Sequence, residues 1–571
     1  CRVKYKDQWH DVTSQSEKQK YSFRKYIEQN SSAELPWADN IIWLRNVLKS
    51  NGPKIKNNMF YSDSSWSDFI ELIAQTNPED ERTGKKVIGS LRYYANFEKC
   101  HEVLTKEILI SKLDRKKIEH ISKEFVDREQ TKYYEKMGKQ LLLFRGRGGT
   151  GKTIRLLQLA YYMYHRKCER VLILTYNTAL VADLQRLLAL MKIRNNIGGQ
   201  GLEVKTIHQF MFQWFKALEL DTNNFINEYH DLQKDFLNYL KEGALTKEEV
   251  KDTIQEESTN LEWDHIMIDE SQDWPENEKK ILYELYGPNK FVIADGVDQL
   301  VRGVTPINWR DNINKANSQV VSLTKSLRLK SGLTKFVQHF ADAIDYGQWD
   351  LEPEPDNYGG KVIVLEGDKG LVKENFDKYI LDLKNHGNEN IDMLFCVPPS
   401  WVVETKDVNK KGQTVTTRHS RIAQMLTSWG YSVWDGVDRN TRHFFPKNKE
   451  QLRVVQYESC RGLEGWTVVN LAFDEFHDIK NHMSESDIEL SKYSDGGTLD
   501  WQATDDEILQ NHANKWAMIP LTRAIDTLII HINSSESFIG NILKGIHERH
   551  PEEIEWISIN QHTTGEDDVP F

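Results

Sequence analysis

The chain has 571 residues, a formal net charge of −12, and a composition that is 39% hydrophobic and 11% aromatic. This length exceeds what one hydrophobic core supports, so several domains are expected, and the apolar content excludes a disordered protein. No run of about 18 apolar residues occurs, so we expect no membrane-spanning helix. The acidic charge argues against indiscriminate coating of nucleic acid but allows a local basic groove.

The cysteines are five in number, widely scattered and without a CxxC pair. This pattern predicts reduced thiols in a cytoplasmic protein, and neither a disulfide framework nor a zinc or iron–sulfur site. The first residue is Cys1 instead of Met, and no signal-peptide pattern follows it. We therefore expect the chain to be a fragment of a longer protein.

Residues 1–115 predict a partial α/β domain. Two short strands are expected within residues 2–12, an amphipathic helix over 15–29, a strand over 40–44 and a helix over 66–75. This order resembles the downstream half of a nuclease-related (NERD) domain of the PD-(D/E)xK type, whose metal-binding half would precede Cys1. An accessory domain that docks a protein partner or a second copy of the chain explains the segment equally well.

A phosphate-binding loop is the strongest local pattern. The apolar run Leu141 to Phe144 predicts a strand, the segment GRGGTGKT follows it, and a helical pattern begins at Lys152. Glycines allow backbone N–H groups to converge on phosphate oxygens, and the helix dipole adds to this attraction. Lys152 is expected to reach the β- and γ-phosphates and Thr153 to hold Mg²⁺. The expected ATP-binding residues of the loop are Gly146, Gly148, Gly149, Thr150, Gly151, Lys152 and Thr153.

Strands alternate with helices on both sides of residue 320. Apolar runs at 171–175, 263–268 and 290–294 each end in polar residues, which predicts a doubly wound parallel sheet over residues 116–320 with its site at the carboxyl ends of the strands. A helical insertion is expected at about 221–260. The same rhythm over 321–571 predicts a second α/β domain, with a polar insertion at about 474–514.

Two adjacent acids follow the strand at 263–268. In a protein with a P-loop, Asp269 is expected to bind Mg²⁺, and Glu270 to accept a proton from the water that attacks the γ-phosphate. Acids at strand ends are common in α/β proteins, but their place behind a P-loop favours the catalytic interpretation.

Taken in order, the motifs GRGGTGKT, LTYN, TIHQF, DESQD, ADGVDQ, SLRLKSGL, ESCRGLEGW and PLTRAIDTL resemble those of superfamily 1 helicases of the UvrD/Rep kind. The resemblance covers about residues 125–535. It implies an α/β fold of two RecA-like P-loop domains with ATP in the cleft between them. It also implies a helicase or translocase that acts on single-stranded nucleic acid, with DNA favoured over RNA. Fusion to a nuclease would suggest a role in DNA repair or antiviral defence.

The resemblance assigns roles to residues. Gln130 would read adenine, Gln299 would sense the γ-phosphate, and Glu464 would hold the ribose. Arg328 and Arg523 would be arginine fingers from the second domain. The strand backbone would contact Thr175, Asn177, Thr206 and His208, with Tyr176 packing on a base. A buried structural imidazole is the alternative for His208, and a surface ion pair is the alternative for Arg328.

Three departures from the family pattern stand out. Leu327 occupies the place of a Tyr that stacks on adenine, no aromatic pair follows Gln299, and the second domain is too short for a large regulatory insertion. Trp309 is a candidate substitute for the missing aromatic pair. A second hypothesis is therefore a nucleotide-gated assembly or sensor ATPase, which switches a protein partner without translocation.

Overall fold

The computed structural model describes residues 2–5, 8–11, 16, 20–21, 41–44, 59–65, 67–68, 110–122, 132–191, 193, 201–220, 222–296, 307–347, 349, 351–353, 357–367, 371–408, 414–438, 441–446, 448–482 and 505–558. Gln130 and Gln299 therefore lie outside the described residues. The chain divides into two compact units, Cys1–Leu109 and Ile110–Phe571.

The first unit contains two strand pairs in its described part. Strands β1 (Arg2–Tyr5) and β2 (Gln8–Asp11) are antiparallel and lie where the sequence predicts two short strands. Strands β3 (Ile42–Leu44) and β4 (Met59–Tyr61) are parallel. Most of the two helices expected at 15–29 and 66–75 lies outside the described residues. The nuclease resemblance stays a prediction.

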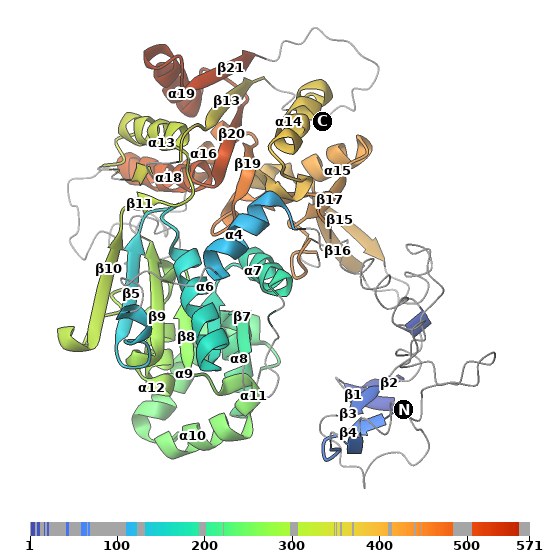
Figure 1. Cartoon of the computed structure of the whole chain (residues 1–571), viewed down its shortest axis with the longest axis vertical. Helices are drawn as coiled ribbons and strands as arrows, with labels where there is room; N and C mark the ends of the chain where they lie inside the picture. The colour runs from blue at the N-terminus through green and yellow to red at the C-terminus, as the bar shows by residue number, and fades with distance from the viewer. Residues whose placement is uncertain are drawn as a thin grey trace. The chain divides into compact units, whose positions relative to one another are not determined.

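The second unit contains two large parallel sheets (Figure 1). The first has six strands in the order β10-β5-β9-β8-β6-β7, and its neighbouring strands are all parallel. Its strands are β5 (Leu141–Gly146), β6 (Arg170–Thr175), β7 (Gly201–Thr206), β8 (His265–Ile268), β9 (Phe291–Gly296) and β10 (Ser318–Leu323). Strand β10 crosses the expected domain boundary at residue 320, and the domain division stays a proposal.

Helix α4 (Lys112–Ser122) precedes the first strand of this sheet in the chain. Helices then follow the strands as the alternating pattern predicts: α6 (Lys152–Tyr162), a π-helical turn (Met163–Lys167), α7 (Thr178–Leu190), α8 (Ile207–Ala217) and α12 (Glu276–Tyr286). The segment expected to be a helical insertion forms α9 (Phe225–Glu242), α10 (Lys247–Glu256) and α11 (Ser258–Leu261). Local sequence sets these ends: Thr206 and Gln209 form a capping box on α8, and Gly243, with φ of 73°, ends α9.

The second sheet has seven parallel strands in the order β17-β18-β14-β19-β20-β13-β21. They are β13 (Lys361–Glu366), β14 (Met393–Val397), β17 (Ser432–Asp435), β18 (Gln451–Gln456), β19 (Gly465–Asn470), β20 (Ala524–Ile532) and β21 (Ile554–Ser558). Its helices are α13 (Ser331–Ala343), α14 (Lys373–Asn385), α15 (Arg421–Ser428), α16 (Phe473–Asn481), α18 (Asp505–Leu521) and α19 (Phe538–Arg549).

Shorter elements connect these layers. Strands β11 (Lys325–Ser326) and β12 (Glu352–Pro353) form a parallel pair. Strands β15 (Val402–Val408) and β16 (Thr414–Ser420) form an antiparallel pair that the sequence did not predict. Turns of 3₁₀ helix lie at Ser271–Asp273, Pro288–Lys290, Lys315–Asn317, Asn390–Asp392, Pro399–Trp401 and Tyr457–Ser459.

Both faces of the first sheet are covered. Leu141 and Leu143 of β5 belong to one buried cluster, whereas Leu142 and Phe144 belong to another that continues into the second sheet. Such strands read as continuous apolar runs because neither face meets water. The predicted α/β fold class is confirmed by the two large parallel sheets, an arrangement consistent with the expected tandem RecA-like domains. Among the described residues, every helix is too short or too polar to cross a bilayer.

Candidate nucleotide site

The P-loop is a tight turn between β5 and α6. Gly149 and Gly151 have φ of 88° and 79°, a region that L side chains rarely adopt. A Cβ on Gly151 would also lie 2.4 Å from Cδ1 of Leu327. Leu327 therefore packs on the loop, and glycine is required at residue 151 both for its backbone angle and for space.

Lys152 lies inside this turn. Its Nζ donates hydrogen bonds to the carbonyl oxygens of Gly146 (2.8 Å) and Arg147 (3.1 Å), and the residue is buried. Burial lowers the pKa of Lys152, although the nearby carboxylates of Glu270 and Asp269 oppose that change. The ammonium group thus bridges loop carbonyls at the place where the sequence predicts phosphate oxygens.

Thr153 and Asp269 meet beside the loop. The Thr153 hydroxyl donates to Oδ2 of Asp269 at 2.8 Å, and Asp269 is fully buried at the end of β8. Burial and the neighbouring Glu270 carboxylate raise the pKa of Asp269 to about 6. A hydroxyl and a carboxylate are oxygen donors of the kind that Mg²⁺ prefers, so this pair fits the predicted metal role.

Glu270 follows Asp269 with a left-handed backbone, φ 54°. Its Oε2 accepts a hydrogen bond from Nε2 of Gln272 (2.8 Å) and lies 3.4 Å from Nε of Arg461, which comes from the second-sheet part of the chain. Burial alone would raise the pKa of Glu270, but Arg461 and Lys152 outweigh it and lower the pKa to about 2. The neighbouring cations therefore keep the Glu270 carboxyl group ionised.

Two predicted arginine fingers come from the second-sheet part of the chain. Nε of Arg328 donates to Oε2 of Glu464 at 2.6 Å, and Nη1 donates to the carbonyl oxygen of Thr522 at 3.2 Å. Arg523 is buried, and its Nη2 has no hydrogen-bond partner within the described part of the chain. Burial and the charge of Arg328 lower the pKa of Arg523 to about 10. Nε of Arg523 donates to the carbonyl oxygen of Ile519 at 3.0 Å, so part of the buried guanidinium is satisfied and Nη2 is suited to receive an anion.

A single pocket collects these groups. It is lined by Gly148, Gly149, Gly151, Lys152, Thr153, Glu270, Arg328, Glu464 and Arg523 from the predicted set, together with Lys117, Asp183 and Gly462 and apolar residues of α6 and α7. Gly146 and Thr150 lie in the same loop, and Asp269 contacts the pocket through Thr153. The structure thus joins predicted residues from both sheets in one cavity.

The five residues predicted to contact the nucleic-acid strand differ from one another in burial and in hydrogen-bond partners. Thr175 and Thr206 are buried, and the Thr206 hydroxyl caps α8 by accepting from the Gln209 backbone N–H. His208 is exposed, which rules out the alternative of a buried imidazole. The Asn177 amide nitrogen donates to the carbonyl oxygens of Ser459 (2.9 Å) and Arg461 (2.6 Å). Asn177 therefore joins the two halves of the unit.

Tyr176 belongs to an aromatic cluster. Its ring packs edge-on against His208 and Trp274, each with centroids 5.3 Å apart, and its hydroxyl donates to the buried carboxylate of Glu278. Tyr229 from the insertion helix α9 donates to the same carboxylate at 2.6 Å. The insertion helix α9 is therefore linked to Tyr176, one of the predicted strand-contact residues, through the shared Glu278 carboxylate.

Trp309 is not the stacking platform that the sequence left as a candidate. Its side chain is 1% exposed and its Nε1 donates to the carbonyl oxygen of Ser271 at 3.2 Å. It packs against Trp274 and Tyr283 in the core. A base could reach this ring only if the core opened.

Sequence reasoning missed two polar residues that line the pocket, Lys117 and Asp183, and one that contacts Glu270 beside it, Arg461. Arg461 stands within ESCRGLEGW, so the motif itself could have indicated it. Lys117 and Asp183 lie on α4 and α7, outside every motif, and only the packing of these helices brings them to the pocket. The alternative of a surface ion pair for Arg328 is also corrected: Arg328 pairs with Glu464 in a mostly covered position, with side chains 13% and 12% exposed.

A separate cluster of His339, His550 and Glu553 could hold a cation by composition. The two imidazole rings are stacked, with centroids 4.0 Å apart and planes 8° apart, and Nδ1 of His339 lies 2.8 Å from Oε2 of Glu553. A metal ion lies close to the plane of each imidazole that binds it, and nearly parallel stacked planes do not meet at one point. The cluster is therefore a ring stack with a hydrogen bond between His339 and Glu553.

No family model matches the chain, and no curated protein matches it. Among solved structures, the arterivirus nonstructural protein 10 (helicase) aligns with 72% of this chain at 10% sequence identity and a TM-score of 0.28. The alignment spans 64% of that helicase, less than two thirds of its length. The TM-score is too low for this likeness to bear on fold or function.

Proposed function

We propose that this chain is an ATP- and Mg²⁺-dependent motor of the superfamily 1 helicase type that translocates along single-stranded nucleic acid, DNA before RNA. One observation supports it most: the pocket is lined by the P-loop and Glu270 from the first-sheet half and by three charged residues, Arg328, Glu464 and Arg523, from the second-sheet half. A cleft of this kind is completed only when both halves approach, which links hydrolysis to motion.

In the proposed reaction, the P-loop backbone and Lys152 bind the phosphates of ATP. Thr153 and Asp269 hold Mg²⁺, which neutralises phosphate charge when bound. Glu270 accepts the proton of the attacking water. Arg328 and Arg523 stabilise the charge that develops on the transferred phosphoryl group.

The strand is expected to run past α7 and α8. His208 is exposed at the start of α8, with the rings of Tyr176 and Tyr229 beside it. Stacking on such rings contributes about 1–3 kcal/mol per base and tolerates any sequence. The proposal also keeps Gln130 as the residue that reads adenine and Gln299 as the residue that senses the γ-phosphate. It further includes a nuclease fused at the N-terminal end, which would serve DNA repair or antiviral defence.

The alternative is an ATPase that switches a protein partner without moving along a strand. It is favoured by the burial of Trp309 and by the commitment of the Asn177 amide to Ser459 and Arg461, since neither residue offers a contact to nucleic acid in this conformation.

The deciding experiment is steady-state ATP hydrolysis alone and with single-stranded DNA, single-stranded RNA or duplex DNA. Lys152→Ala and Glu270→Gln serve as controls, the first expected to lose hydrolysis with weakened ATP binding, the second with binding retained. Strong stimulation by one single strand supports the motor and identifies its track. Hydrolysis that ignores every nucleic acid, while both controls stay inactive, would favour the partner switch.

A further inference from the structure

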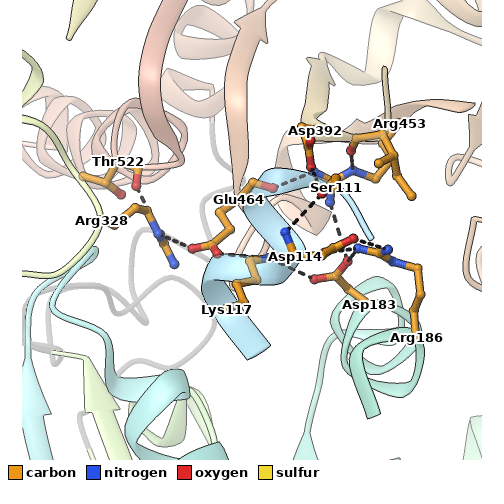
Figure 2. Close-up of polar contacts among 11 residues, drawn as sticks. Ser111, Asp114, Lys117, Asp183, Arg186, Arg328, Asp392, Arg453, Glu464 and Thr522 are labelled. Atoms are coloured by element: carbon orange, nitrogen blue, oxygen red, sulfur yellow. Dashed lines mark hydrogen bonds and ion pairs between the residues drawn. The ribbon is translucent and has the colours of Figure 1, made fainter. Parts of the chain in front are cut away.

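Helix α4 lies between the P-loop half and the second-sheet half and contacts both. On the first side, Asp114 receives two hydrogen bonds of 2.6 Å from Arg186 of α7, and the His120 carbonyl oxygen accepts from Gln158 of α6 at 2.8 Å. On the second side, the Ser111 hydroxyl donates to Oδ1 of Asp392 at 2.8 Å. The contacts of Asp114 with Arg186 and of Ser111 with Asp392 hold the helix beside the pocket (Figure 2).

Lys117 points from this helix into the nucleotide pocket. Its Nζ lies 2.9 Å from Oε1 of Glu464 and 3.8 Å from Oδ2 of Asp183, and the residue is 8% exposed. Figure 2 shows Glu464 between Lys117 on one side and Arg328 on the other. Each carboxylate oxygen of Glu464 is therefore bound by a different cation.

This arrangement leaves hydrogen-bond acceptor sites of the Glu464 carboxylate available. An ionised carboxylate has about four acceptor sites on its two oxygens. Lys117 uses one site on Oε1 and Arg328 uses one on Oε2. The remaining sites can accept hydrogen bonds from two adjacent hydroxyl groups, which is the chemistry of a ribose 2′,3′-diol.

The two cations differ in what they can do once a triphosphate is bound. Arg328 is the proposed finger for the γ-phosphate, so its bond to Glu464 is expected to break when it turns to the phosphate. Lys117 sits on a helix held by Asp114 and Ser111, and it stays beside Glu464. After nucleotide binding, Lys117 is thus the cation that keeps this buried carboxylate ionised and oriented.

We propose that Lys117 is a specificity-determining positioning residue, which holds the Glu464 carboxylate for the ribose hydroxyls and makes the pocket prefer ribonucleotides over deoxyribonucleotides. This inference rests on the proposed function, because it requires ATP to bind in this pocket. It assigns α4, which carries no recognisable motif, a direct part in nucleotide choice.

The test compares ATP, 2′-deoxyATP and 2′,3′-dideoxyATP as substrates, with KM and kcat measured separately. The variants are Lys117→Met, Lys117→Gln and Lys117→Arg, with Glu464→Gln as the variant that removes the carboxylate. The matched control is Lys116→Met, because Lys116 is exposed on the same helix and outside the pocket. Calorimetric titration with ADP and 2′,3′-dideoxyADP repeats the comparison without turnover.

In the wild type, loss of hydrogen bonds to a charged acceptor is expected to raise KM for 2′,3′-dideoxyATP by roughly tenfold or more over ATP. This ratio should fall close to one in Lys117→Met, Lys117→Gln and Glu464→Gln, mainly because KM for ATP rises. Lys117→Arg should retain most of the wild-type KM ratio, and Lys116→Met should retain the whole ratio. A general packing defect would instead change KM for all three nucleotides together.

A ratio that stays at the wild-type value in a folded Lys117→Met or Lys117→Gln variant would overturn the inference and leave the proposed function intact. A wild type that hydrolyses all three nucleotides with equal KM would overturn it as well, together with the ribose role of Glu464. Absence of ATP binding by the wild type would overturn the proposed function itself and the inference with it.

Discussion

At the scale of single residues, Glu270 is held ionised but only weakly basic in this conformation. Its Oε2 is close to both Arg461 and Gln272, and its pKa lies at about 2. A carboxylate with a low pKa is a weak proton acceptor. Arg461 is carried by the 459–462 turn, and Asn177 binds the carbonyl oxygens of Ser459 and Arg461 in that turn.

Replacing Arg461 with Ala should raise the pKa of Glu270, because the nearest cation is removed and the penalty of burial then dominates. The proposed mechanism requires Glu270 to be ionised, so the acidic limb of the pH–rate profile should move to higher pH. The profile of kcat/KM between pH 4 and 8 measures this shift. Arg421→Ala, an exposed arginine on α15, is the matched control, and an unmoved acidic limb in Arg461→Ala would contradict the assignment.

Replacing Arg523 with Ala should slow hydrolysis by about 10³-fold or more while ATP affinity stays within a few-fold. The reason is that an arginine finger binds charge that develops mainly in the transition state. Single-turnover hydrolysis and equilibrium binding separate the two effects. Equal losses in rate and in affinity would make Arg523 a ground-state binding residue.

At the scale of elements, α4 shows how a helix without a motif becomes part of a site. Asp114 and Arg186 form a buried, doubly hydrogen-bonded pair, with side chains 2% and 11% exposed. Burial opposes ionisation of Asp114, but Arg186 and Lys117 outweigh it, and the pKa of Asp114 is lowered. Its contribution to stability is therefore present above the unfolded pKa of about 4 and is lost as pH falls through the folded pKa.

Asp114→Ala should lower the free energy of unfolding by about 3–5 kcal/mol, because it leaves the Arg186 guanidinium buried without its main partner. Urea denaturation at pH 7 followed by tryptophan fluorescence measures the change. The exposed neighbour change Lys116→Ala should stay within about 0.5 kcal/mol of the wild type. The double variant Asp114→Ala/Arg186→Met should recover part of the loss, and no recovery would mean that the pair is not the cause.

At the scale of the whole molecule, the Ile110–Phe571 unit contains the complete pocket and both large sheets. One of its buried clusters draws on residues from both sheets, so the two halves share part of their hydrophobic core. A unit with its own core can fold by itself.

A chain limited to residues 110–571 is therefore expected to fold and to retain basal ATP hydrolysis within a few-fold of the whole chain. Circular dichroism checks that the shortened chain folds, and the steady-state assay checks its ATP hydrolysis. Lys152→Ala in the same shortened chain gives the background rate. An unfolded product, or a folded one without hydrolysis, would show that residues 1–109 complete the enzyme.

Much of the fold could be read from local patterns. Buried parallel strands such as β6 and β9 are continuous apolar runs, and helices such as α8 begin at recognisable caps. The β15–β16 pair escaped prediction because its strands, VVETKDV and TVTTRHS, are short and polar. Such strands are defined by cross-strand pairing, which a local window does not contain.

By itself, the sequence determined the P-loop, the Asp269–Glu270 pair and the order of strands and helices, because each depends on residues adjacent in the chain. The tertiary structure alone decided that Lys117 enters the pocket, that the Arg461 guanidinium lies 3.4 Å from Glu270, that Asn177 joins the two halves, and that Trp309 is buried. These outcomes depend on contacts between residues far apart in the chain. Packing between helices and sheets selects those contacts, and no spacing along the chain encodes them.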